Sequence, residues 1–344
     1  APGHHARRGA GPGAAIGGFI GVLAGVFVLL IIAVNVADDD DDVEPVSALP
    51  KPTFTLPSIT PYRPPSSDTG YDRERTAEAT RDAADDEAEP AEVTRPETTT
   101  VNRSLRDNSL YTAGRLPSVS CPAGAVSIYN HTQLKNLILR TGQCMNRAWK
   151  PVLERAGFVH RPPGYAIAAV RGRGACGDYP QRGSIVPYYC PRNTTIYAST
   201  SAMARGSGNA IGYGQITSWH GAIISMMAHE YGHHVQYLTG LTDGWWRQTL
   251  ESTSESAKLA LSRRLELQAT CLGGMWMRSV TASYPVPTSR RNLLYAFYSR
   301  VGDHPGYPRD HGSPANNYRW FRTGYEFNST QRCNTWRASP STVS

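Results

Sequence analysis

The sequence predicts an α+β domain over residues 109–338, preceded by a single transmembrane helix and a disordered acidic linker. Three observations lead to this prediction. A long uncharged segment lies near the start of the chain, an acidic and proline-rich segment follows it, and the remainder mixes helical and strand periodicity. About 230 residues remain for the last part, enough for one domain with a substantial core.

Residues 14–36 are expected to form the transmembrane helix, after a cytoplasmic tail over residues 1–13. Ala14–Val34 carries no charge over 21 residues, which is long enough to cross a bilayer as a helix. Arg7 and Arg8 precede it and an aspartate run follows, so the positive-inside rule predicts a cytoplasmic N-terminus and an extracytoplasmic domain at the cell membrane. A cleaved signal peptide is the alternative.

Small residues recur at intervals of four within this apolar segment. Such a ridge allows two helices to pack closely, which would give a homodimer through Gly17, Gly21 and Gly25. An ordinary lipid-facing helix is the alternative.

The next segment, residues 38–108, is expected to be a disordered linker. Between Asp38 and Thr100 it holds 17 acidic and 6 basic residues, a net charge of −11, among Pro, Thr, Ser and Ala. Too few apolar side chains are present to form a core, so the segment should hold the folded domain away from the membrane.

The folded part carries the opposite charge. Residues 101–344 contain 27 Lys and Arg against 11 Asp and Glu, a net charge of +16. Such a surface suits anionic envelope polymers, lipid headgroups, the acidic linker or simply solvent. No nucleic-acid-binding motif accompanies the charge, so nucleic acid is not an expected partner.

All six cysteines follow the apolar segment, and their even number fits disulfides in an oxidising compartment. The sequence does not choose among the possible pairings. No C-x-x-C pair is present, which argues against a thiolate zinc site. The working hypothesis pairs Cys121 with Cys144, Cys176 with Cys190 and Cys271 with Cys333.

Two helices are expected at the start of the domain. Residues 131–147 have apolar side chains at helical spacing, and residues 149–156 are a candidate for a second helix around Pro151.

Strands are predicted next. The segment YAIAAV, residues 165–170, is typical of a strand, and SIVPYYC and TTIYAST, residues 184–190 and 194–200, should pair as a hairpin. The glycine-rich residues 205–214 lack the context of a nucleotide-binding turn and are predicted to be a loop.

A helix is predicted around the segment MMAHEYGHHVQYLTG, which begins at Met226. Apolar residues recur at helical spacing from Ile223, and Gly240 is a suitable stop. Thr217 or Ser218 is the expected N-cap.

This helix contains an H-E-x-x-H motif. A spacing of four rotates a helical side chain only about 40°, so His229 and His233 should face one ion, and two imidazoles suit Zn²⁺. Glu230 would then be the general base that accepts a proton from water held at the ion. His234 points elsewhere. A helix that is merely rich in histidine is the alternative.

The third ligand should lie on the following helix, within SESAKLALSRRLELQATCLGGMWMRSV. A histidine-type extension, H-E-x-x-H-x-x-G-x-x-H, is excluded because Gln236 and Thr239 occupy the positions of its glycine and third histidine.

Three carboxylates remain candidates for the third ligand, Glu251, Glu255 and Glu266. Glu266 lies in an apolar stretch, where a carboxylate is costly to bury without a partner such as a metal. The alternative for Glu266 is an exposed position and an ion pair with Arg263 or Arg264.

Five segments together resemble the bacterial neutral zinc metallopeptidase family: AHEYGHHVQYLTG, RRLELQATCLGGMW, HGSPANNYRWF, CNTW and YYCPRNTTIY. The resemblance covers most of residues 109–336 and none of the linker. It implies a zincin-like metallopeptidase domain with His229, His233 and Glu266 as ligands of Zn²⁺.

One position departs from the family pattern. Many relatives have aspartate where this chain has Thr270, and in related peptidases that aspartate orients a ligand histidine. A threonine hydroxyl would accept the same imidazole N–H without a charge, so the ligand is expected to be less basic.

The resemblance implies a zinc peptidase that acts on a peptide or protein substrate, and the apolar segment with its flanking charges predicts that this peptidase is membrane-anchored and extracytoplasmic. His311, steadied by Asp310, is the candidate for stabilising the tetrahedral intermediate, with a structural loop histidine as the alternative. Residues 194–200 are expected to be the edge strand that aligns the peptide backbone, with an ordinary hairpin strand as the alternative. Two alternatives stay open: a non-catalytic, zinc-stabilised envelope-binding module, and an enzyme that hydrolyses non-protein amides.

Overall fold

The computed structural model describes residues 100–181, 186–205, 219–284, 288–303 and 308–344. The predicted tail, the predicted transmembrane helix and most of the predicted linker lie outside these ranges, as does most of the glycine-rich segment predicted to be a loop. Within them, no helix is both long and apolar enough to cross a membrane. Helices and strands are both present, so the α+β prediction is confirmed.

A long helix, α1 (His131–Arg155), replaces the two helices predicted for this region. The Asn130 side chain caps its start by accepting a hydrogen bond from the Gln133 N–H. Pro151 lies inside the helix and removes one backbone donor. The helix continues because its apolar face continues: Trp149 and Val152, on either side of the proline, are buried. The prediction of a break was therefore wrong.

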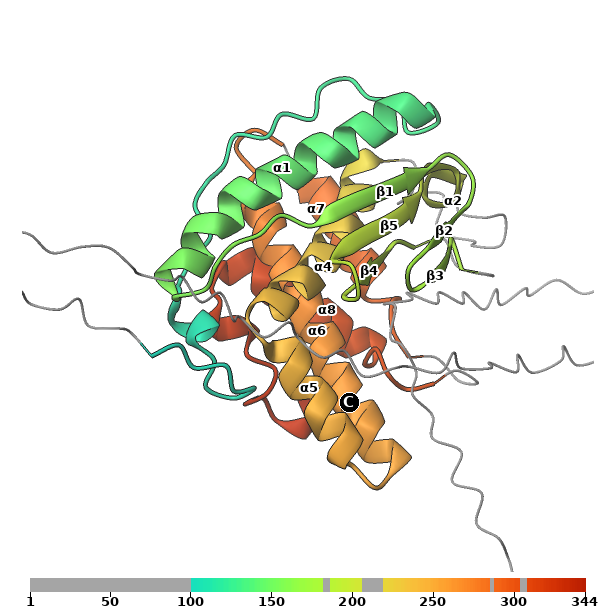
Figure 1. Cartoon of the computed structure of the whole chain (residues 1–344). Coiled ribbons are helices and arrows are strands. Elements are labelled where there is room, and N and C mark those ends of the chain that lie inside the picture. The colour runs from blue at the N-terminus through green and yellow to red at the C-terminus, as the bar shows by residue number, and fades with distance from the viewer. Residues whose placement is uncertain (1–99, 182–185, 206–218, 285–287, 304–307) are drawn as a thin grey trace, which may run out of the picture. The chain divides into compact units, whose positions relative to one another are not determined.

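A three-stranded sheet lies beside α1 (Figure 1). Its strands are β1 (Gly164–Ala168), β5 (Thr195–Ser199) and β4 (Tyr188–Cys190), in that spatial order. β1 and β5 are parallel, whereas β5 and β4 form the antiparallel hairpin that the sequence predicts. A smaller ribbon, β2 (Gly172–Gly174) with β3 (Gly177–Tyr179), was not predicted from the sequence.

The expectation that residues 194–200 form an edge strand was wrong. β5 occupies these residues and is hydrogen-bonded on both sides, to β1 and to β4. Among the described residues, β4 is the edge strand next to β5. A hairpin alone does not show which of its two strands will gain a further neighbour, and here the neighbour comes from residues that precede the hairpin.

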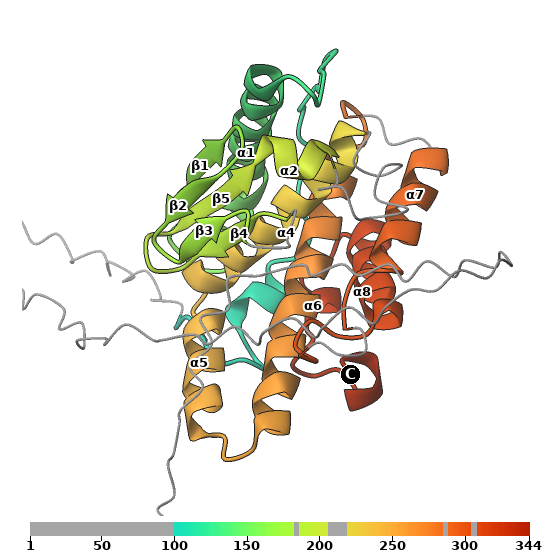
Figure 2. The same cartoon turned by 90° about the vertical axis from the view of Figure 1, so that its right-hand side faces the viewer.

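The helices that follow the sheet pack in layers against it (Figure 2). The motif helix α4 lies between the sheet and α6, and α6 lies against α8. The helices are α2 (Thr200–Arg205), α4 (His220–Leu238), α5 (Leu241–Glu251), α6 (Glu255–Ser279), α7 (Thr288–Tyr298) and α8 (Pro314–Phe327).

The start of α4 differs from the prediction, whereas its end agrees. Trp219 is the N-cap and makes no side-chain cap hydrogen bond, so neither Thr217 nor Ser218 holds this position, and both lie outside the described residues. The indole of Trp219 folds over Gly221, and this packing takes the place of a polar cap. Gly240 follows the helix with φ of 76°, a left-handed conformation that glycine adopts without strain.

The folded part is longer than the predicted residues 109–338. Leu105, assigned to the linker from the sequence, is buried, and the Asn108 side chain donates to the Thr239 carbonyl. At the other end, Val343 is buried and its carbonyl accepts from Arg263. The contacts of Leu105 and Asn108 could not be predicted because the residues before 109 are mostly polar in composition.

The three predicted disulfides are confirmed. They join Cys121 to Cys144, Cys176 to Cys190 and Cys271 to Cys333, and no cysteine remains free. They tie the segment before α1, the small ribbon and the C-terminal segment to the core.

Candidate metal centre

Two glycines allow the motif helix α4 and helix α6 to approach closely. A Cβ atom on Gly232 would lie 2.8 Å from the carbonyl oxygen of Ala269, and one on Gly273 would lie 3.0 Å from the backbone nitrogen of His229. A side chain at either position would force the two backbones apart. The close approach brings the carboxylate of Glu266, on α6, to the histidines of α4.

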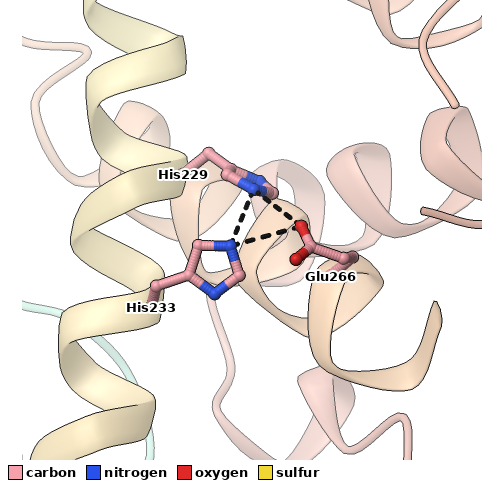
Figure 3. Close-up of side chains that lie close together, drawn as sticks. All are labelled: His229, His233 and Glu266. Atoms are coloured by element: carbon pink, nitrogen blue, oxygen red, sulfur yellow. Dashed lines mark hydrogen bonds and ion pairs between the residues drawn. The ribbon is translucent and has the colours of Figure 1, made fainter. Parts of the chain in front are cut away.

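Three side chains meet in this contact (Figure 3). The Nε2 atoms of His229 and His233 are 3.1 Å apart, and Glu266 Oε2 lies 3.3 Å from the first and 3.2 Å from the second. Four tetrahedral ligands about 2.0–2.1 Å from a zinc ion are separated by about 3.3 Å. The three donor atoms therefore already have the spacing of three corners of a zinc site.

Hydrogen bonds at Nδ1 of His233 fix its tautomer, so that the lone pair of Nε2 faces this cluster. Its Nδ1 lies 2.9 Å from Gln236 Oε1. The Gln236 amide nitrogen donates to the Leu265 carbonyl and to Gln268, so its oxygen must be the acceptor toward His233. His233 therefore carries its proton on Nδ1 and presents an unprotonated Nε2 to a metal.

A second chain of hydrogen bonds orients His229. Its Nδ1 lies 3.2 Å from Thr270 Oγ1, and that hydroxyl donates to Asn317 Oδ1 at 3.4 Å. The Asn317 nitrogen donates to the His311 and Gly312 carbonyls, which leaves its oxygen as the acceptor. The Thr270 oxygen can then accept the Nδ1 proton of His229, the role considered for it from the sequence. The donor set and both tautomers thus fit a zinc ion.

Because the three donor side chains are buried and close together, the pKa of each depends strongly on the charge of the others. Burial alone would raise the pKa of Glu266, but the charges of His233 and His311 hold that pKa well below its usual range. Burial would lower the pKa of His233, yet Glu266 raises it to about 9. For His229 burial prevails and lowers the pKa to about 4. A metal would replace the proton that His233 and Glu266 otherwise share.

Glu230 is fully buried and does not belong to this cluster of donors. Its Oε2 accepts the backbone N–H of Tyr189 on β4 at 2.8 Å, and its Oε1 accepts no hydrogen bond from any described residue. Burial raises the pKa of Glu230 to about 8. A carboxylate with one oxygen held and the other available suits proton transfer.

The structure also brings His311 near the cluster. Its charge helps to lower the pKa of Glu266 and opposes the rise that burial causes in the pKa of Glu230. His311 Nδ1 lies 2.5 Å from Asp310 Oδ1, as predicted for the steadying role of that aspartate, and its backbone N–H donates to Asp303. Burial would lower the pKa of His311, but Glu266 and the two aspartates raise it to about 9.

The other carboxylates considered for the third ligand lie elsewhere. Glu251 ends α5 and Glu255 begins α6, and both are exposed. The alternative ion pairs for Glu266 are not formed, because Arg263 donates to the Val343 and Arg309 carbonyls and Arg264 donates to the Thr335 and Ala338 carbonyls.

Three residues of the site were not identified from the sequence: Tyr189, Gln236 and Asn317. Gln236 lies three residues after His233, a spacing that brings two helical side chains together, so this contact had a local signal. Tyr189 and Asn317 come from distant segments, and no pattern in the sequence links them to the motif.

Comparison with known proteins gives several relatives. The chain is 25% identical to the uncharacterized protein YpfJ of Escherichia coli K12 over 201 residues, which are 56% of this chain and 67% of the relative. It is 28% identical over 227 residues to the uncharacterized proteins Rv2575 of Mycobacterium tuberculosis and Mb2605 of Mycobacterium bovis, covering 59% of this chain and 70% of each relative. No solved structure matches the chain.

A family model described as "Putative neutral zinc metallopeptidase" matches residues 120–336. The matched range includes α4, α6 and all three donors of the cluster. The match extends over more than half of the chain, and the chain belongs to the putative neutral zinc metallopeptidase family.

Proposed function

We propose that this protein is a zinc-dependent peptidase that hydrolyses peptide bonds outside the cytoplasm, held at the membrane through residues 14–36. Two neighbouring features carry the proposal: a donor set with zinc spacing, formed by two histidines of α4 and Glu266 of α6, and the buried Glu230 of α4, which has one carboxylate oxygen that accepts no hydrogen bond from the described residues. A site that only stored a structural ion would have no need of that second carboxylate.

Each residue of the site has a separate role in the proposed reaction. Zinc bound by His229, His233 and Glu266 would lower the pKa of water toward 7 and polarise a substrate carbonyl. Glu230 accepts a proton from the attacking water at Oε1 and later gives it to the leaving amine. His311, held by Asp310, donates a hydrogen bond to the oxygen on which negative charge develops.

Strand β4 takes the substrate-aligning role that the sequence assigned to residues 194–200. In an antiparallel strand the N–H and C=O of one residue point to the same side. The Tyr189 N–H points to Glu230, so its carbonyl lies on the same edge of β4. A peptide added as a further strand at this edge would run beside the general base.

The proposal is tested with the full chain loaded with zinc and incubated with a diverse peptide library. Wild-type protein should cleave peptides, and excess chelator should stop the cleavage. Glu230→Gln keeps the shape and an acceptor for the Tyr189 N–H but cannot take a proton. It should retain zinc and lose cleavage by a factor on the order of 10² or more.

If zinc-loaded wild-type protein cleaves nothing in the library, the peptidase proposal is wrong. The proposed function is then that of a non-catalytic binding module. The uncharged Thr270 behind His229 favours that second function, because it makes a less basic metal site than aspartate would.

A further inference from the structure

The motif helix carries two interleaved pairs of side chains. His229 and His233 are four residues apart and face the metal cluster, and Glu230 and His234 are also four residues apart and share a different face. His234 is completely buried yet is not one of the metal-ligand group. Both members of the second pair contact one residue of the edge strand, Tyr189.

The hydrogen bonds of Tyr189 and His234 have defined directions. His234 Nε2 lies 2.6 Å from the Arg161 carbonyl, which can only accept, so this nitrogen carries the proton. His234 Nδ1 is therefore an acceptor, and the Tyr189 hydroxyl donates to it at 3.1 Å. The same tyrosine donates its backbone N–H to Glu230 Oε2. Tyr189 is thus fastened to α4 at both its ring end and its main chain.

We propose that His234 is a positioning residue for Glu230. It fixes Tyr189 against α4, and the Tyr189 N–H in turn holds one carboxylate oxygen of Glu230 and leaves the other for the proton of the attacking water. Because the described structure supplies Glu230 with this one donor, a small shift of β4 would let the carboxylate rotate. The inference rests on the proposed function for its catalytic consequence, but the positioning itself can be measured without any substrate.

Two variants of His234 separate its hydrogen bonds. The amide of Asn reaches about as far as Nδ1, so His234→Asn keeps an acceptor for the Tyr189 hydroxyl and loses the bond to Arg161. The amide of Gln reaches about as far as Nε2, so His234→Gln keeps the bond to Arg161 and loses the acceptor. The two variants are therefore matched in polarity, and only His234→Asn keeps the hydrogen bond with the Tyr189 hydroxyl.

The first measurement is amide hydrogen exchange in the full-length protein. Tyr188 and Tyr189 are the only consecutive tyrosines in the chain, so tyrosine labelled with ¹⁵N and carbonyl ¹³C identifies the Tyr189 amide uniquely. This amide should exchange on the order of tenfold faster in His234→Gln than in wild type and close to wild type in His234→Asn. The Tyr165 amide on β1, which pairs with β5 and not with β4, should not change in either variant.

Equal exchange of the Tyr189 amide in wild type and His234→Gln would overturn the proposal. So would an equal acceleration at Tyr189 and Tyr165, because that result would indicate general loosening of the sheet. Both of these exchange results can be obtained whether or not the protein cleaves peptides. They therefore distinguish failure of this inference from failure of the proposed function.

The second measurement is the rate of peptide cleavage. His234→Gln and Tyr189→Phe should each lower kcat on the order of 10- to 100-fold with unchanged zinc affinity, because neither side chain is one of the metal-ligand group. The double variant should be no slower than the slower single variant, since both act through one contact. In a Glu230→Gln background neither change should lower the residual rate further. A further loss in that background would make His234 a structural residue only and overturn the proposal.

Discussion

The Nδ1 atom of His229 lies 3.2 Å from the hydroxyl oxygen of Thr270, one helical turn beyond Glu266 on α6. Thr270→Val removes this acceptor and keeps the shape of the side chain. Partners of this kind typically change metal affinity 10- to 100-fold, so the variant should bind zinc about 10- to 100-fold more weakly. Competition with a chromophoric chelator measures the change.

Thr270→Ser is the matched control, because it keeps the hydroxyl between His229 and Asn317. It should bind zinc within a few-fold of wild type. Wild-type affinity in Thr270→Val would mean that this hydroxyl does not support the ligand.

The identity of the third ligand is tested by a pair of alanine variants. Glu266 is 2% exposed and lies within 3.3 Å of both histidines, whereas Glu251 is exposed at the end of α5. Glu266→Ala should lose zinc during dialysis against a weak chelator under conditions in which Glu251→Ala retains one equivalent. Metal analysis by mass spectrometry gives the result, and equal retention by both variants would move the third ligand elsewhere.

The parts of this site that were predicted from the sequence depend on local geometry. Helical spacing alone directs His229 and His233 to one point, and the apolar neighbours of Glu266 on its own helix indicate that it is buried. The α4 and α6 helices and the hairpin of β4 and β5 were predicted for the same reason.

The parts that were not predicted depend on contacts between distant segments. Asn317 reaches Thr270 from α8, and Tyr189 reaches Glu230 from β4, 47 and 41 residues away in sequence. The central position of β5 likewise depends on β1, which precedes the hairpin. A one-dimensional pattern carries no information on which segments become neighbours.

The three disulfides should contribute unequally to stability. Cys271–Cys333 closes a loop of 62 residues and Cys176–Cys190 closes one of 14. The loop-entropy relation gives about 4 kcal/mol for the first and about 3 kcal/mol for the second. Replacing both cysteines of each pair by alanine should therefore lower the free energy of unfolding more for the longer loop. Denaturant unfolding with excess chelator measures this without a contribution from metal, and a larger loss for the shorter loop would contradict the entropy argument.

The proposed location makes a prediction about intact cells. Arg7 and Arg8 precede the apolar residues 14–36 and five aspartates follow them, a distribution from which the positive-inside rule predicts a basic domain outside the cytoplasm. A membrane-impermeant protease added to intact cells should cut within residues 38–99 and release the domain, which its disulfides and packed core should protect. Immunoblotting of the medium with an antibody against the domain detects the fragment.

A cytoplasmic marker protein must stay intact in the same sample, which shows that the cells were not lysed. If the full-length protein survives until the cells are lysed, either the orientation or the anchor has been assigned incorrectly.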